Sequence, residues 1–229
     1  MTAEMEWADG DYDAALHLLD RQIVDVDGLA VGKADDVELT PVDDDLVVTG
    51  LLTGPAALIP RLGGRAGGWL LRHYAAIKVA RAHPTEPEAV DIAQVARVTS
   101  QIELAVPRRG LLRSREDGIR RHRIGDLLDA PVRLPDGSRA GRVIDVRLAQ
   151  RADSGALVVS ALVVDRHNVG GLLGYDRAQV DGPVAVAALV RWLHRRARLV
   201  ALRHADVDWQ RREVVVDLPR HGEPLTPAR

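Results

Sequence analysis

The sequence contains no cysteine and no phenylalanine, and aromatic residues form only 3% of its 229 residues. Without cysteine, a disulfide framework, a thiolate nucleophile and a cysteine-based zinc site are excluded. No run of roughly 18 uncharged apolar residues occurs, so the sequence predicts no membrane-spanning helix. The acidic N-terminal segment has neither the basic nor the apolar region of a secretory signal. We therefore expect a cytoplasmic protein, either free or peripheral at the inner membrane.

Common catalytic and cofactor-binding motifs are also missing. The chain has no GxxxxGK(S/T) phosphate loop, no HExxH metal motif and no GxSxG nucleophile motif. We therefore expect no enzyme activity, no cofactor and no metal site. Three groups of residues leave open an anion-binding loop or a cation site. We favour a flexible connection for the glycine-rich group and solvated side chains for the two acidic or histidine-containing groups. These groups are residues 63–68 (GGRAGG), residues 43–45 (DDD), and His194 with His204 and Asp206 or Asp208.

What the sequence does contain is a long internal repeat. Residues 18–39 align with residues 127–148 at an offset of 109 without a gap, and 9 of 22 positions are identical. A period of this length indicates two copies of one small domain. The identical pairs are Leu18/Leu127, Leu19/Leu128, Asp20/Asp129, Asp27/Asp136, Gly28/Gly137, Gly32/Gly141, Asp36/Asp145, Val37/Val146 and Leu39/Leu148.

The repeat predicts five segments along the chain. They are a disordered acidic lead (1–14), a first repeat (15–106), a basic linker (107–123), a second repeat (124–218) and a disordered tail (219–229). The Asp-Gly pairs predict tight hairpin turns in both repeats, and Gly32 and Gly141 predict bulges in the strands that follow. Further strands are expected at 46–53 and 157–165, inserted helices at 67–80 and 183–198, and closing strands at 89–93, 97–106, 199–203 and 213–218.

Short strands, Asp-Gly turns and little helix predict an all-β or β+α fold. We expect two small six-stranded antiparallel barrels, each with a helix inserted before the closing strands, because closure removes exposed strand edges. Alternation over residues 141–148 places Ile144, Val146 and Leu148 in the barrel interior. It leaves Asp145 facing outward or capping a neighbouring strand.

These residues resemble the PRC-barrel family. The pattern runs Leu-Leu-Asp at 18–20, Asp-Gly at 27–28 and Gly-Lys-x-x-Asp-Val at 32–37, and it recurs at 127–129, 136–137 and 141–146. The family includes barrels of the photosynthetic reaction-centre H subunit and of RimM-type ribosome maturation factors. The resemblance covers most of the chain and implies a docking module without shared catalytic residues. The inserted helices depart from the family's shorter form.

Charge is distributed unevenly between the two halves. Residues 1–106 carry 8 basic and 18 acidic residues, a net charge of −10, whereas residues 107–229 carry 23 and 15, a net of +8. Either the basic half meets an anionic partner or the halves partly neutralise each other. The candidate anion- or partner-binding surface consists of Arg191, Arg195 and Arg198 on the second inserted helix with Arg120, Arg121 and Arg123 in the linker.

Trp69 and Trp192 occupy equivalent places in the two inserted helices. Each either seals its helix onto its barrel or forms a helix-to-helix contact between repeats or between subunits of a homo-oligomer. From the resemblance and the missing motifs, we expect a non-enzymatic adaptor that docks onto a protein partner. The alternatives are a RimM-like factor that binds ribosomes or RNA, an anionic membrane surface as the partner, and an enzyme or small-ligand binder that uses residues 63–68.

Overall fold

The computed structural model describes residues 12–61, 87–112, 119–165 and 197–217. Strands form 51% of this described part and helices are few and short, so the predicted predominance of β structure is confirmed. The inserted helix at 67–80, most of the one at 183–198, and both tryptophans on them lie outside the described residues.

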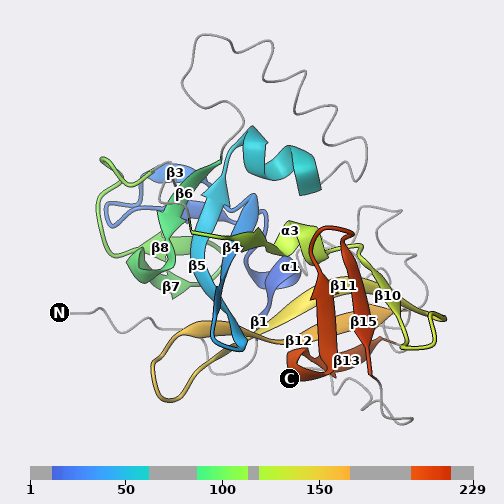
Figure 1. Cartoon of the computed structure of the whole chain (residues 1–229). Helices are drawn as coiled ribbons and strands as arrows, with labels where there is room; N and C mark the ends of the chain where they lie inside the picture. The colour runs from blue at the N-terminus through green and yellow to red at the C-terminus, as the bar shows by residue number, and fades with distance from the viewer. Residues whose placement is uncertain (1–11, 62–86, 113–118, 166–196, 218–229) are drawn as a thin grey trace, which may run out of the picture. The chain divides into compact units, whose positions relative to one another are not determined.

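The chain divides into two compact units, and their bounds differ from those of the sequence repeats (Figure 1). Unit 1 comprises Met1–Asp11, His17–Gly125 and Gln150–Val158, whereas unit 2 comprises Tyr12–Leu16, Asp126–Ala149 and Val159–Arg229. Each unit therefore includes a segment that belongs to the other repeat by sequence. The repeat bounds, which rest on internal similarity, stay a prediction.

Unit 1 is built mainly from the first repeat. Strands β3, β2, β8 and β7 form one sheet in that order, and β9, β4, β5 and β6 hydrogen-bond in a second row. A helix follows β5 at residues 55–61. The strands and the short 3₁₀ helix are β2 (Gln22–Val24), β3 (Ala30–Lys33), β4 (Asp36–Val42), β5 (Asp45–Thr53), β6 (Glu88–Asp91), η1 (Ile92–Gln94), β7 (Val95–Val98), β8 (Ile102–Leu104) and β9 (His122–Arg123).

Unit 2 is built mainly from the second repeat. Strands β14, β15, β10 and β11 hydrogen-bond in that order, β12 follows β11, and β13 pairs with β12. The elements are β1 (Tyr12–Asp13), α1 (Ala14–His17), α3 (Ile124–Leu127), β10 (Pro131–Arg133), β11 (Arg139–Gln150), β12 (Leu157–Asp165), β13 (Arg198–Ala201), η4 (Leu202–His204), β14 (Ala205–Asp208) and β15 (Glu213–Val216). Helix α1 extends one residue, and α3 two residues, into the segments assigned to unit 1.

The two repeats share backbone details that explain why their sequences agree. Asp20 and Asp129 both adopt left-handed backbone angles, with φ of 64° and 63°. Aspartate tolerates this conformation better than most residues do. The N–H of each donates to an equivalent carbonyl, that of Ala34 and that of Val143, at 2.8 and 2.9 Å. The Leu-Leu-Asp motif therefore encodes a turn that leads into the first hairpin.

The predicted Asp-Gly turns and glycine bulges are confirmed. Gly28 and Gly137 have φ of 75° and 81°, and each closes a three-residue hairpin loop with a bulge. The pairing of β2 with β3 skips one residue beside Gly32, and the pairing of β10 with β11 does the same beside Gly141. These bulges bend the strands at matching positions in the two repeats.

Two details of the predicted strands are wrong. In β11, Val143 is buried and Ile144 is partly exposed, because the alternation of burial shifts by one residue between Ile144 and Asp145. The closing strand expected at 97–106 is instead a hairpin of β7 and β8, which turns between Val98 and Ile102. A short 3₁₀ helix precedes that hairpin and also the corresponding hairpin of unit 2.

A reciprocal exchange of short segments links the two repeats. In unit 2, β1, which precedes the first repeat, pairs with β11 of the second repeat through Tyr12 opposite Leu148. In unit 1, β9, which precedes the second repeat, pairs with β4 of the first repeat through His122 opposite Leu39. Leu39 and Leu148 are equivalent residues of the repeat, so the segment that precedes each repeat adds an edge strand at the same place in the other repeat.

Equivalent aspartates hold the two exchanged segments. Asp36 Oδ1 accepts hydrogen bonds from the N–H of Gly125 at 2.9 Å and of Val37 at 2.8 Å. Asp145 Oδ1 accepts from the N–H of Ala15 at 2.8 Å and of Val146 at 2.7 Å. The backbone N–H that starts each exchanged helix is therefore bound by an aspartate of the other repeat. A Cβ at Gly125 would lie 2.5 Å from Asp36 Oδ2, so only glycine fits there.

The bulges make Gly32 and Gly141 sensitive to substitution. We expect Gly32→Val and Gly141→Val each to destabilise the fold by about 1–3 kcal/mol. A Cβ at Gly32 would lie 3.4 Å from the Thr53 methyl group, and Gly141 has a φ of 154°. Thermal unfolding measures the effect, with Ala30→Val as a control because Ala30 is exposed on the same strand as Gly32. Equal melting temperatures for all three variants would contradict the bulge interpretation.

Candidate functional site

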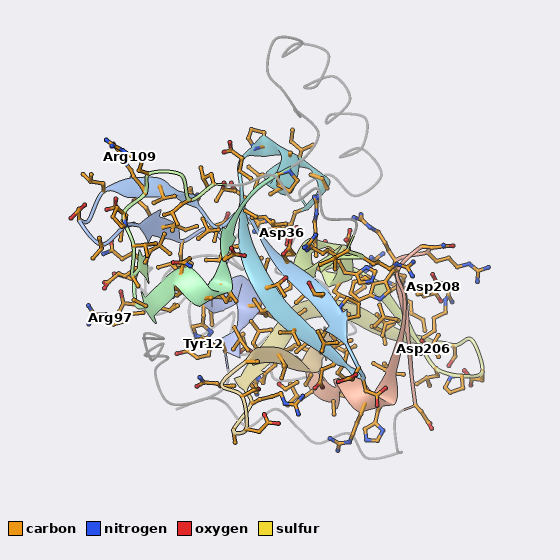
Figure 2. The ribbon with its side chains drawn as sticks, turned by 60° about the vertical axis from the view of Figure 1, so that its left-hand side comes forward. Tyr12, Asp36, Arg97, Arg109, Asp206 and Asp208 are labelled. Atoms are coloured by element: carbon orange, nitrogen blue, oxygen red, sulfur yellow. The ribbon has the colours of Figure 1, made fainter. Side chains whose placement is uncertain are left out.

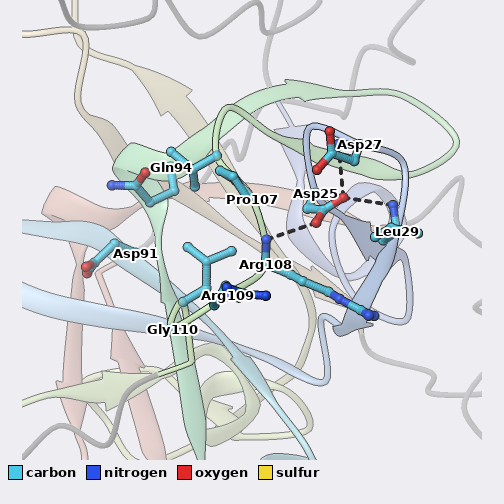
Figure 3. Close-up of a pocket in the computed structure, with 11 residues that line it drawn as sticks. Asp25, Asp27, Leu29, Asp91, Gln94, Pro107, Arg108, Arg109 and Gly110 are labelled. Carbon is cyan, nitrogen blue, oxygen red and sulfur yellow. Dashed lines mark hydrogen bonds between the residues drawn. The ribbon is translucent and has the colours of Figure 1, made fainter.

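Unit 1 contains a cleft of about 740 Å³ that opens between loops of the first repeat and the start of the segment that follows it (Figure 3). Three parts of the chain line it. They are the β2–β3 hairpin loop (Asp25, Asp27, Leu29), the end of β6 with η1 (Asp91, Gln94), and the segment after β8 (Val106, Pro107, Arg108, Arg109, Gly110, Leu111).

Asp25 fixes the shape of this cleft. One carboxylate oxygen, Oδ1, accepts hydrogen bonds from the N–H groups of Asp27 at 3.0 Å and Leu29 at 2.8 Å. The other, Oδ2, accepts from the N–H of Arg108 at 2.9 Å (Figure 3). The buried side chain of Asp25 therefore ties the hairpin loop to the segment after β8. Both walls are held before any ligand arrives.

The Asp25 carboxyl is suited to this role as an anion. Its burial disfavours ionisation, but three backbone N–H hydrogen bonds outweigh that effect, with a smaller contribution from the Arg108 charge. Together they hold the pKa of Asp25 below its usual value. With all three bonds used internally, Asp25 is a positioning residue for the cleft.

A second turn places Arg109 on the wall opposite the hairpin. The N–H of Leu111 donates to the carbonyl of Arg108 at 3.4 Å, and Gly110 between them has a φ of 75°. A left-handed third residue is the requirement of a type II turn, which glycine meets without strain. Arg109, at the second position of this turn, extends away from the ribbon of unit 1 (Figure 2).

The cleft combines unpaired charge with apolar surface. The side chains of Asp27 and Arg109 make no hydrogen bond or ion pair, and both are exposed. Arg108 donates to the carbonyl of Ala30 at 3.3 Å. Leu29 is 47% exposed and its neighbour Val26 is 57% exposed, although large apolar side chains in the described residues are mostly buried. Exposed apolar side chains beside unpaired charges are typical of a binding surface.

The second repeat does not reproduce the Asp25 contacts. Where the first repeat reads Asp25-Val26-Asp27-Gly28, the second reads Leu134-Pro135-Asp136-Gly137. The loop conformation is the same, because the N–H of Leu134 donates to the carbonyl of Ser138 as that of Asp25 donates to Leu29. The leucine at 134 has no side-chain acceptor, so it cannot make the hydrogen bonds that Asp25 makes in the first repeat.

The predicted arginine surface is only partly described, and part of what is described is used internally. Arg121 forms an ion pair with Glu38 at 3.4 Å, and Arg123 donates to the carbonyl of Ala56 at 3.2 Å. Arg120 is exposed, and Arg198 is exposed at the start of β13. Arg191 and Arg195 lie outside the described residues, as do residues 63–68 and His194. A continuous arginine surface therefore stays a prediction.

Ion pairs support the alternative in which the acidic and basic halves neutralise each other. Arg147 pairs with Asp13 at 3.0 Å, and Arg121 pairs with Glu38. Arg151 pairs with Asp45 at 2.5 Å, which also explains part of the acidic run at 43–45. In each pair the acid comes from the first half of the sequence and the arginine from the second.

The described residues hold no cluster of three or more histidine or acidic side chains arranged to bind a metal ion. Within the same part of the chain, no helix is long and apolar enough to cross a bilayer. No protein-family model matches this chain, and neither does any curated protein. The resemblance to PRC-barrels therefore stays a prediction from the quoted motifs.

Sequence reasoning missed the cleft. Asp27 was identified only as a turn residue, and Asp25, Arg108 and Arg109 were not singled out. One signal was available, namely that Asp25 is replaced by leucine in the aligned position of the second repeat. A difference inside an otherwise matching hairpin marks a feature that only one copy has.

Proposed function

We propose that this chain is a non-enzymatic adaptor, built of two PRC-like β-barrels, that binds a protein partner through the cleft of unit 1. The observation that carries the proposal is the set of Asp25 hydrogen bonds, which join the hairpin loop to the segment after β8 and so fix both walls of the cleft. A preformed surface loses less conformational entropy when a partner binds than a mobile one does. The exposed side chain of Leu29, together with Val106 and Leu111, supplies apolar lining beside the unpaired charges of Asp27 and Arg109.

Strand pairing supports the barrel part of the proposal. An early strand of each repeat pairs in parallel with its last strand, β2 with β8 and β10 with β15. This pairing brings the two ends of a repeat together, as the closure of a small barrel requires. The bulges beside Gly32 and Gly141 supply the bending that closure also needs.

The proposal can be tested by affinity capture with the full-length chain. We expect the wild-type protein to retain a partner protein after nuclease treatment, and Arg109→Glu to lose it. Arg120→Glu is the matched control, because Arg120 is also an exposed arginine but does not line the cleft. Thermal unfolding of both variants checks that they are folded.

The RimM-like alternative predicts a different outcome from the same experiment. Ribosomal proteins and RNA would be captured, nuclease or moderate salt would release them, and Arg120→Glu would weaken the capture more than Arg109→Glu. A partner that stays bound to Arg109→Glu would refute docking through the cleft.

A further inference from the structure

The charges around the cleft follow a regular order. In the view of Figure 3, Arg109 lies between Asp91 on one side and Asp27 on the other, whereas the Arg108 side chain runs away from both and donates to the carbonyl of Ala30. Asp25 adds little to this pattern, because three backbone N–H groups already surround its carboxylate. A ligand that reaches Arg109 therefore meets a basic group with an acidic group on either side.

This order opposes a nucleic-acid strand. A strand carries a negative charge at every phosphate, so phosphates on either side of Arg109 would meet the carboxylates of Asp27 and Asp91. Like charges placed opposite each other select against a partner as effectively as attraction selects for one. A single acidic group flanked by basic groups meets no such repulsion.

The apolar lining favours a polypeptide over a small free anion. Leu29, Val106 and Leu111 line the same cleft as the charged groups, and about 740 Å³ is far more than one carboxylate or phosphate fills. In an extended segment, alternate side chains point the same way, so residues two apart along the chain can face the cleft together.

We propose that the cleft of unit 1 binds an extended segment of a partner protein in which an aspartate or glutamate is flanked on both sides by lysine or arginine. The acidic side chain pairs with Arg109, and one of the basic side chains pairs with Asp27. This inference rests on the proposed adaptor function, to which it adds the chemistry of the partner.

The test uses the isotope-labelled full-length chain and three synthetic probes. The first is a blocked pentapeptide with lysine at both ends, aspartate in the centre and alanine between. The second is the same peptide with the charges exchanged, and the third is a hexamer of single-stranded RNA. We expect the first probe alone to shift the backbone amide signals of Asp27, Leu29 and Leu111. Equal shifts from the charge-exchanged peptide, larger shifts from RNA, or no shift from any probe would overturn the inference.

A charge-reversed variant separates recognition from folding. The double substitution Asp27→Lys with Arg109→Glu is expected to reverse the preference, so that the charge-exchanged peptide binds about tenfold more tightly than the original one. A variant that had merely lost its fold would bind neither peptide. A folded double variant that still prefers the original peptide would refute the assigned pairs.

Capture and peptide binding can fail separately. If Arg109→Glu releases the captured partner but the first peptide causes no shift, the adaptor proposal stands and the charge pattern is wrong. If the partner stays on Arg109→Glu while the peptide binds in the cleft as described, docking of that partner through the cleft is wrong and the peptide site remains.

Discussion

Replacing Asp36 with alanine is expected to lower the free energy of unfolding by about 2–5 kcal/mol, because two backbone N–H groups lose their acceptor inside the protein. One of them, that of Gly125, starts the helix that follows the exchanged strand β9. The side chain of Asp36 is almost completely buried, so water cannot replace the lost hydrogen bonds without opening the structure.

The conservative variant decides how this effect is interpreted. Asp36→Asn keeps an oxygen at the same place and is expected to cost much less than Asp36→Ala in urea unfolding. Asp145→Ala should act in the same way on unit 2, through the N–H groups of Ala15 and Val146. Equal losses for alanine and asparagine at position 36 would show that the carboxyl does not act as the acceptor that holds the segment.

Stability is expected to fall as the pH rises from 5 to 8. Burial raises the pKa of Asp36 to about 6, although the hydrogen bonds from Gly125 and Val37 and the charges of Arg123 and Arg61 act in the opposite direction. Burial also raises the pKa of Asp145 to about 7. The N–H of Ala15 lowers it, and the nearby charge of Asp13 raises it further. Both values lie above that of an aspartate in an unfolded chain.

The sign follows from proton binding in the two states. Between the unfolded pKa and the folded pKa, the folded chain holds more protons than the unfolded chain, so raising the pH favours unfolding. The two shifts correspond to roughly 3–4 kcal/mol for each group at most. Below this window the trend reverses, because the pKa values of Asp25 and Glu103 are lowered in the fold and their stabilisation is lost as they become protonated.

Urea unfolding at several pH values between 5 and 8 measures this dependence. The double variant Asp36→Asn with Asp145→Asn removes both titrating groups and should flatten the profile, because asparagine has no proton to lose. Histidines titrate in the same range in both proteins, so the difference between the profiles isolates the two aspartates. An unchanged slope in the double variant would contradict the assignment.

Local features of the fold were predictable because they depend on neighbouring residues. The Asp-Gly pairs required positive φ angles in a tight loop, and both glycines have them. Gly32 and Gly141, in the strands that follow these turns, predicted bulges, and the strand pairing confirms them. The runs at 46–53 and 157–165 are β5 and β12 within one residue. The burial of Ile144 was predicted wrongly, because the prediction assumed a regular strand, whereas the alternation in β11 shifts by one residue between Ile144 and Asp145.

The cleft was not predictable in the same way. Asp25 and Arg108 are 83 residues apart, and the bond between them joins a side chain to a backbone N–H. A backbone N–H carries no information in the sequence, so its partner can be found only once the fold has brought the two loops together. The sequence could not predict that Arg109 makes no ion pair either, because ion pairing depends on which carboxylates the fold brings within reach.

The sequence by itself determined that the chain is a duplicated, mostly β protein with matching hairpins, and it placed equivalent aspartates at 36 and 145. It did so because turn conformations and strand alternation are set by a few adjacent residues. Only the tertiary structure decided that each aspartate binds the start of the other repeat's helix, and that Asp25 joins the two walls of the cleft in unit 1. Both depend on contacts between residues about 80 to 130 positions apart, which are selected by packing of the whole chain and not by any local pattern.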